Sequence, residues 1–312
     1  MSFQFNDFVA AIKSGKSLDS ADVLHLRQWL WSDGVGSRDE VDHLFALNSE
    51  IAAPTLDWTD FFVETVSGYV VNGREPRGYV SDEDAGWLIS KVVADGQIDS
   101  MSELALIVRV LERATNAPDR LKNVVIEQIE RTVLTGKGPT RSGGSISPGQ
   151  IDHAEVDILR RLIFAPASNG PACVSALEAE MLFRLKDATL GSANAAGWQK
   201  LFVQGVGNFL MAHSDHSPFS RDEAAKYEAL MNDTTVNISG FLARMSKAFD
   251  SRGAWEALKE GDNAKASAAH DVAVAREAEI VPNEQIWLNA RIDADGVKDE
   301  LEAALVEFLA AD

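Results

Sequence analysis

The sequence predicts an all-α protein built as a tandem duplication, and three observations support this prediction. Apolar residues recur at helical spacing along most of the chain. Alternating runs of Val, Ile and Thr, which are typical of strands, are absent. Several segments of the first half recur in the second half in the same order, which is the mark of a repeated structural unit.

Composition and charge narrow the class of protein. The 312 residues predict about two domains, and 46% hydrophobic residues are enough for a sizeable core. The net charge of -19 argues against nucleic acid or an anionic membrane as a partner, because both need a basic surface. A single cysteine, Cys173, excludes an intrachain disulfide and favours a reducing compartment. With no signal-peptide pattern and no run long enough to span a membrane, we expect a cytoplasmic protein with a protein partner.

Local start and stop signals divide the first half into helices. A short helix is expected over about 5–12, and a second from about Ser20 to a stop at Asp33-Gly34. Ser37 and Glu40 match a capping box, in which the two side chains satisfy free backbone N–H groups at a helix start. The same signals predict four further helices, over about 58–71, 81–93, 100–111 and 118–133.

The second half repeats these segments. Residues 287–296 align with 87–96 at an offset of 200, and 198–211 align with 58–71 at an offset of 140. The Gly-, Ser- and Pro-rich residues 135–150 are predicted to be a linker. The expected organisation is therefore a first helical domain over 1–134 and a second over 151–312, with a helical insertion at about 234–283.

Four helix-stop turns occur at corresponding places in the two halves. They read Asp33-Gly34, Asp95-Gly96, Asn169-Gly170 and Asp295-Gly296, and a glutamate follows each after a short gap: Glu40, Glu103, Glu178 and Glu300. This pattern resembles the tellurite-resistance protein TerB and its relatives, including the N-terminal domain of DjlA-type co-chaperones. Each half has about the size of one such domain. The resemblance implies an all-helical fold and a role in stress response or tellurite resistance rather than a catalytic reaction.

The resemblance also implies a divalent metal, Ca²⁺ or Mg²⁺, near the turns. The ligands it implies are Asp95, Asp99 and Glu103 in the first half and Asp293, Asp295, Asp299 and Glu300 in the second. Carboxylates suit both ions, which take oxygen ligands. An EF-hand does not fit, because its first ligand position would fall on Lys91 or Arg291. Helix capping alone explains the same residue types without a metal, so both interpretations stay open.

Two functions follow from these observations. The first is a non-enzymatic helical scaffold that binds a protein partner, with or without divalent cations at the acidic turns. The alternative is a metal-dependent hydrolase that uses the same carboxylates, which would have to converge in one pocket. No catalytic residue and no organic cofactor are predicted.

Overall fold

The computed structural model describes residues 20–31, 37–51, 53–93, 96–141, 147–167, 174–211, 282–292 and 298–311. Over these ranges the chain is helical and forms no strand; an isolated bridge joins Tyr79 and Asn116. The prediction of an all-α fold is confirmed for this part of the chain. The helix predicted over 5–12, Cys173 and almost all of the predicted insertion lie outside the described residues.

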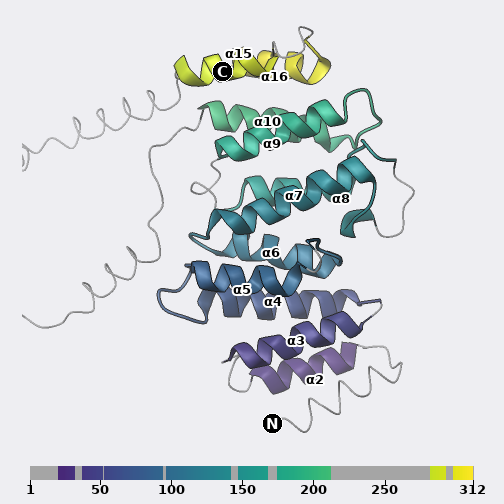
Figure 1. Ribbon diagram of the computed structural model, residues 1–312, viewed down its shortest axis with the longest axis vertical. Helices are drawn as coiled ribbons and strands as arrows, with labels where there is room; N and C mark the ends of the chain where they lie inside the picture. Colours follow the sequence, from purple (N-terminus) through teal and green to yellow (C-terminus); the bar gives the residue numbers. More distant parts are fainter. Residues whose placement is uncertain are drawn as a thin grey trace, which may run out of the picture.

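The helices follow the chain in one order from end to end of the molecule (Figure 1). They are α2 (Ser20–Trp31), α3 (Arg38–Glu50), α4 (Leu56–Asn72), α5 (Asp82–Val92), α6 (Met101–Arg113), α7 (Asp119–Thr135), the 3-10 turn η1 (Pro139–Arg141), α8 (His153–Ile163), α9 (Ala176–Ala188), α10 (Gly197–Met211), α15 (Pro282–Ile292) and α16 (Glu300–Ala311).

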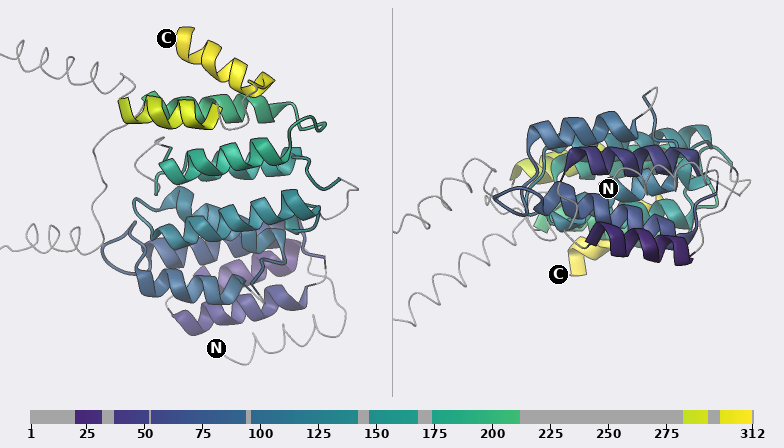
Figure 2. Two further views of the ribbon diagram at one scale, coloured as in Figure 1. Left: turned by 45° about the horizontal axis from the view of Figure 1, so that its top comes forward. Right: turned by 90° about the horizontal axis from the view of Figure 1, so that it is seen from below.

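These helices form a stack of two rows. In one row α4 packs between α2 and α6, α8 packs between α6 and α10, and α16 follows α10. In the other, α7 packs between α5 and α9. Figure 2 shows the same stacking from two further directions. Because α8 lies on α6 and α9 lies on α7, one apolar core runs through both halves of the sequence.

Capping chemistry explains where the helices begin. A Ser or Asp accepts from the N–H three residues on, and the Glu at that position accepts from the N–H of the capping residue. The box predicted for Ser37 is present, and others begin α6 at Ser100, α8 at Asp152 and α9 at Ser175. Ser81 caps α5. Gly96 has φ +79°, the left-handed conformation that a glycine stop requires.

An aromatic cluster fills the core of the first half. The Trp87 ring meets Phe45 edge-on at 6.0 Å between centroids and meets Tyr69 at 6.1 Å. Phe45 in turn meets Phe62 at 5.2 Å and 89°. Edge-to-face rings at these distances add to the stability gained by burial, so Trp87 ties α5 to α3 and α4.

A second cluster lies at the sequence-matched positions of the second half. Trp287 meets Phe183 at 5.4 Å and 86°, and it meets Phe209 at 5.1 Å. Phe183 meets Phe202 at 5.2 Å and 77°. Trp287 therefore ties α15 to α9 and α10 by contacts of the same kind that Trp87 makes.

Part of the predicted linker is packed against the stack. Pro139 and Arg141 in η1 are buried, and η1 contacts both α6 and α7. Gly136 ends α7 in the left-handed conformation, with φ +68°. The Gly- and Pro-rich composition of residues 135–150 did not indicate these contacts, because they depend on the pairing of Arg141 with Glu155, which lies later in the chain.

Candidate functional site

The predicted metal ligands fall into two groups along the sequence, at different levels of the stack. The first-half group lies at the start of α6, and the second-half group lies at the start of α16 (Figure 1). Three of the seven predicted ligands lie outside the described residues: Asp95, Asp293 and Asp295. The other four can be placed.

After the Asp95-Gly96 turn, the second of the four, Asp99 is exposed and Glu103 is half-buried. Glu103 closes the capping box of α6, and its carboxylate accepts from the Ser100 N–H at 3.3 Å. Burial, together with the negative charge of Asp99, raises the Glu103 pKa, although the hydrogen bonds from Ser100 act in the other direction. A cation beside Glu103 would act in the opposite direction and lower this pKa.

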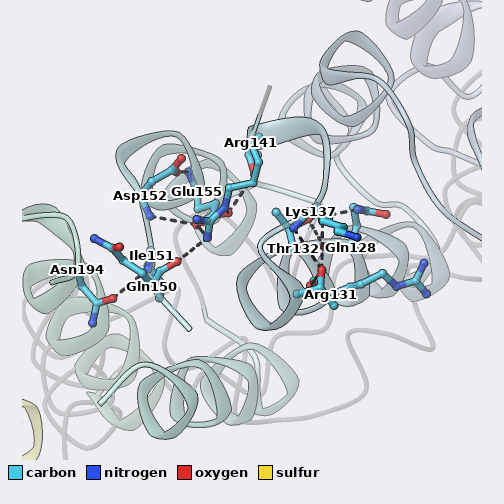
Figure 3. Close-up of polar contacts among 12 residues, drawn as sticks. Gln128, Arg131, Thr132, Lys137, Arg141, Gln150, Ile151, Asp152, Glu155 and Asn194 are labelled. Carbon is cyan, nitrogen blue, oxygen red and sulfur yellow. Dashed lines mark hydrogen bonds and ion pairs between the residues drawn. The ribbon is translucent and has the colours of Figure 1, made fainter. Parts of the chain in front are cut away.

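Residues of α7 hold the backbone at and after Gly96, in the second turn. Arg131 Nη1 donates to the Gly96 carbonyl at 2.8 Å, and the Ile98 N–H donates to Gln128 Oε1 at 3.0 Å. Figure 3 shows how Gln128 also bonds Thr132 one turn further along α7. Because the Gly96 carbonyl already accepts from Arg131, a metal ion at this turn would have to take its ligands from the carboxylates.

At the fourth turn, Asp299 is the N-cap of α16. Its Oδ1 accepts from the Leu301 N–H at 2.8 Å and the Glu302 N–H at 2.9 Å, and Glu302 accepts in return from the Asp299 N–H. Glu302, which was not among the predicted ligands, thus completes the box. Glu300, which was among them, is exposed at the first helical position.

A lysine binds Asp299, one of the four acids that the resemblance implies as metal ligands in the second half. Lys186 of α9 is 1% exposed, and its ammonium lies 2.6 Å from Asp299 Oδ2 and 2.7 Å from Glu302 Oε1. Burial opposes the charge of Lys186, but the hydrogen bonds to Asp299, Glu302 and Asp187 outweigh it and raise the lysine pKa. The fourth turn therefore has an internal cation.

The first half has Asn48 at the position that matches Lys186. Asn48 Oδ1 accepts from Trp58 Nε1 at 3.1 Å and from Ser102 Oγ at 3.2 Å. Lysine has no acceptor to offer. In keeping with that, Trp198 Nε1, the counterpart of Trp58 Nε1, is buried without a hydrogen-bond partner among the described residues. The two halves thus share this core position, but the first half places a hydrogen-bond acceptor there and the second half places a cation.

A second buried ion pair lies where the predicted linker meets α8 (Figure 3). Arg141 donates from Nε to Glu155 Oε1 at 2.7 Å and from Nη2 to Glu155 Oε2 at 2.9 Å. Glu155 is fully buried, and its carboxylate also accepts from Thr140 and from the Asp152 N–H. Burial raises the Glu155 pKa, and the bonds from Asp152 and Arg141 offset only part of the effect.

The segment beside this pair joins α8 to the start of α10. The Ile151 N–H donates to Asn194 Oδ1 at 2.9 Å, and the Ala195 N–H donates to the Ile151 carbonyl at 2.8 Å. Gln150 contributes its carbonyl to Arg141 and its side-chain amide to Ala193. These bonds hold the backbone that leads into α8 against Arg141 on one side and against the segment that leads into α10 on the other.

A third buried pair crosses between the halves. Lys122 of α7 and Glu178 of α9 are 3% and 0% exposed, and Lys122 Nζ lies 3.6 Å from Glu178 Oε1. Glu178 also closes the Ser175 capping box. In all three pairs, a capping-box glutamate of the second half binds a basic side chain from another element of the stack.

The basic partners were not predicted from sequence. Lys186 stands at helical spacing from Leu182 and Phe183, on the apolar face of α9, and a lone lysine at a core position is a signal for a buried acid. Lys122 carries the same signal, since it stands three and four residues before the buried Val125 and Ile126 of α7, whereas Arg141 carries none.

The class of protein that this geometry defines is an all-helical two-row stack in which capping glutamates hold neighbouring helices. No family model, curated protein or solved structure matches the chain. Among the described helices, none combines the length and apolarity that crossing a membrane requires. The described residues also contain no group of three or more His, Cys, Asp or Glu side chains placed to hold a metal ion.

Proposed function

We propose that the chain is a tandem duplication of a TerB-like helical unit that serves as a non-enzymatic scaffold in stress response or tellurite resistance. The matched aromatic clusters around Trp87 and Trp287 support the duplication, because both the positions and the ring geometry recur. A matched ion pair supports it too: Lys91 binds Asp42 at 3.0 Å, and Arg291 binds Glu180 at 3.2 Å.

One observation carries the scaffold proposal. The buried carboxylates at the helix starts of the second half, Glu155, Glu178 and Glu302, bind basic side chains of neighbouring elements. A carboxylate held in this way fixes one helix on another and is not poised for acid–base chemistry. Stacked helical units present long continuous surfaces, which are suited to a protein partner.

The cation part of the proposal applies to the second turn, Asp95-Gly96. Glu103 has a raised pKa beside Asp99, whereas Lys186 already neutralises the fourth turn. A Ca²⁺ or Mg²⁺ ion would accept oxygen ligands from Glu103, Asp99 and Asp95. The scaffold does not depend on this ion.

The alternative of a metal-dependent hydrolase requires acids from different turns to meet. Glu103 begins α6 and Glu300 begins α16, which lie at different levels of the stack (Figure 1). No observation in the described residues favours this alternative.

Calorimetric titration with CaCl₂ and MgCl₂ tests the cation part. We expect binding heat with the unchanged protein, a loss of that heat in Glu103→Gln, and no change in Glu300→Gln, the matched control at the exposed position of the fourth turn. Equal loss in both variants, or no heat at about 1 mM metal, would contradict the assignment. Metal-dependent hydrolysis of simple ester or phosphoester substrates that Glu103→Gln abolished would contradict the non-enzymatic scaffold.

A further inference from the structure

The last two helices of the chain, α15 and α16, lie at one end of the stack and pack on α9 and α10 (Figure 1 and Figure 2). We call the side chains of α9 and α10 that they contact the docking surface: Glu180, Phe183, Lys186 and Phe209. We propose that two copies of the chain exchange α15 and α16, so that each copy supplies the helix pair that covers the docking surface of the other. The product is a dimer completed by residues of both copies.

α15 meets the docking surface through hydrogen-bond donors and an aromatic ring. Trp287 Nε1 donates to Glu180 Oε1 at 2.6 Å, and Arg291 Nε donates to the same oxygen at 3.2 Å. The Trp287 ring also meets Phe183 and Phe209 edge-on. Trp287 and Arg291 stand about one turn apart and therefore share one face of the helix. The docking surface thus selects a helix that carries an indole and a guanidinium at this spacing.

α16 meets the docking surface through a buried ion pair. Lys186 of α9 is 1% exposed, and its ammonium lies between Asp299 Oδ2 at 2.6 Å and Glu302 Oε1 at 2.7 Å. Removing α15 and α16 would expose the aromatic rings of the docking surface to water and take two acids from Lys186. The docking surface therefore favours an occupied state, whichever copy supplies the helices.

α16 is enclosed less completely than α6, the helix that matches it in the first half. α6 packs against α4, α7 and α8, whereas α16 packs on α10 and meets α9 through Lys186. Three apolar residues of α6 are buried: Leu104, Val108 and Leu111. The residues of α16 at the same distances from the capping box are exposed: Ala303, Glu307 and Ala310. An end helix with an exposed outer face separates at a lower free energy than an enclosed helix, so α15 and α16 can leave the stack while α6 stays in place.

A second copy of the chain is the occupant that fits the docking surface in full. Because both copies have the same sequence, every hydrogen bond, ion pair and ring contact of the docked helices is kept when the helices change places. A different protein would have to bring an indole, a guanidinium and two carboxylates to the same places to displace them. An extended chain spans about 3.3–3.6 Å per residue, so residues 212–281, which connect α10 to α15, are long enough to reach a second copy.

The concentration of the chain decides which copy supplies the helix pair. A pair connected to its own docking surface has an effective concentration there, which is millimolar for short flexible connections and falls as the connection lengthens. In dilute solution each chain therefore keeps its own pair. Exchange becomes measurable as the concentration of the chain approaches about 1 mM.

Cross-linking of two single-cysteine variants of the full chain tests the exchange. Both variants carry Cys173→Ser; one also carries Asp187→Cys in α9, and the other carries Lys298→Cys just before α16. Asp187 and Lys298 are exposed. They flank the contact between Lys186 and Asp299. A short bis-maleimide reagent therefore joins the two cysteines when the helices of one copy lie on the docking surface of the other.

The matched control carries Asp39→Cys in place of Lys298→Cys, at an exposed position of α3 near the opposite end of the stack (Figure 1). At about 0.5 mM of each chain, incubated until the yield is constant, we expect the cross-linked dimer to exceed that of the control roughly fivefold or more. Equal yields would overturn the proposal, as would sedimentation of the unchanged chain as a monomer at the same concentration.

Weakening the helix pair of the receiving chain alone should increase capture from the other copy. Glu302→Gln in the Asp187→Cys chain removes a charge that Lys186 binds, so its own α16 competes less well with that of the second copy. We expect a severalfold higher cross-link yield, and no change with Glu307→Gln, at an exposed position of α16. An unchanged or lower yield with Glu302→Gln would also overturn the exchange.

The exchange and the proposed scaffold function fail separately. The match between α6 and α16 rests on the proposed duplication, whereas the contacts of the docking surface do not. None of the cross-linking or sedimentation measurements involves a metal ion or a partner protein. A negative result in them leaves the scaffold and its metal titration standing.

Discussion

Replacing Lys186 with methionine should destabilise the protein more than any change of an exposed lysine. The substitution keeps the apolar stem and deletes the ammonium that lies 2.6 Å from Asp299 and 2.7 Å from Glu302. Glu302 is 1% exposed, so its carboxylate would be left buried without its cation. Breaking a buried ion pair from one side costs about 3–5 kcal/mol, a large share of the roughly 5–15 kcal/mol that stabilises a typical protein.

Urea unfolding followed by circular dichroism measures this loss. Lys200→Met on exposed α10 surface is the control, and a change within about 0.5 kcal/mol is expected there. Since the Lys186 pKa is raised, its stabilisation is present at all pH values below its unfolded pKa, about 10.4, and is lost only as pH rises through the folded value. A loss below about 1 kcal/mol at neutral pH, the value of an exposed ion pair, would refute the reasoning.

Lys186→Asn separates the loss of charge from the loss of packing. It reproduces the amide that Asn48 presents to Trp58 in the first half, and so offers an acceptor to the unpartnered indole of Trp198. We expect Lys186→Asn to cost about 1 kcal/mol less than Lys186→Met, the net value of one buried hydrogen bond. A larger loss for Asn than for Met would show that the two halves do not use this position equivalently.

Three further predictions concern a helix cap, a buried ion pair and two glycines. Glu103→Gln keeps the capping box but removes the titrating carboxyl. Because the Glu103 pKa is raised, the stability that this carboxyl contributes falls as pH rises from about 4 through its folded pKa. The free energy of unfolding in urea should therefore depend less on pH in the variant over that window. Arg141→Met should cost about 3–5 kcal/mol in thermal unfolding, because Glu155 is fully buried; a change below 1 kcal/mol would argue against the pair. Gly68→Ala should stabilise α4 by about 0.5–1 kcal/mol, whereas Gly205→Ala should destabilise α10, since its Cβ would lie 2.5 Å from a leucine side chain; the same sign for both in calorimetry would contradict this.

The helix starts were predictable because capping is local. Ser37, Ser100 and Ser175 each lie three residues before their glutamate, and the hydrogen bonds of a capping box need nothing from the rest of the chain. The same local rule did not identify the box of α16. It begins at Asp299 and closes at Glu302, while the sequence pattern pointed to Glu300.

The buried ion pairs were not predictable, because they depend on tertiary packing. Lys186 lies 113 residues before Asp299, and the two meet only because α9 and α16 both pack on α10. Arg141 stands in a Gly- and Pro-rich segment whose composition favours a linker, yet Glu155 holds it in the core.

The central claim is that the two halves share one core rather than forming separate bundles on a tether. Hydrogen exchange of Lys122→Met tests it most directly, because Lys122 of α7 and Glu178 of α9 join the halves. We predict that exchange protection falls by a similar factor in α4 and in α10, on both sides of the junction. Loss of protection confined to α7 and α9, with α4 and α10 unchanged, would contradict a shared core.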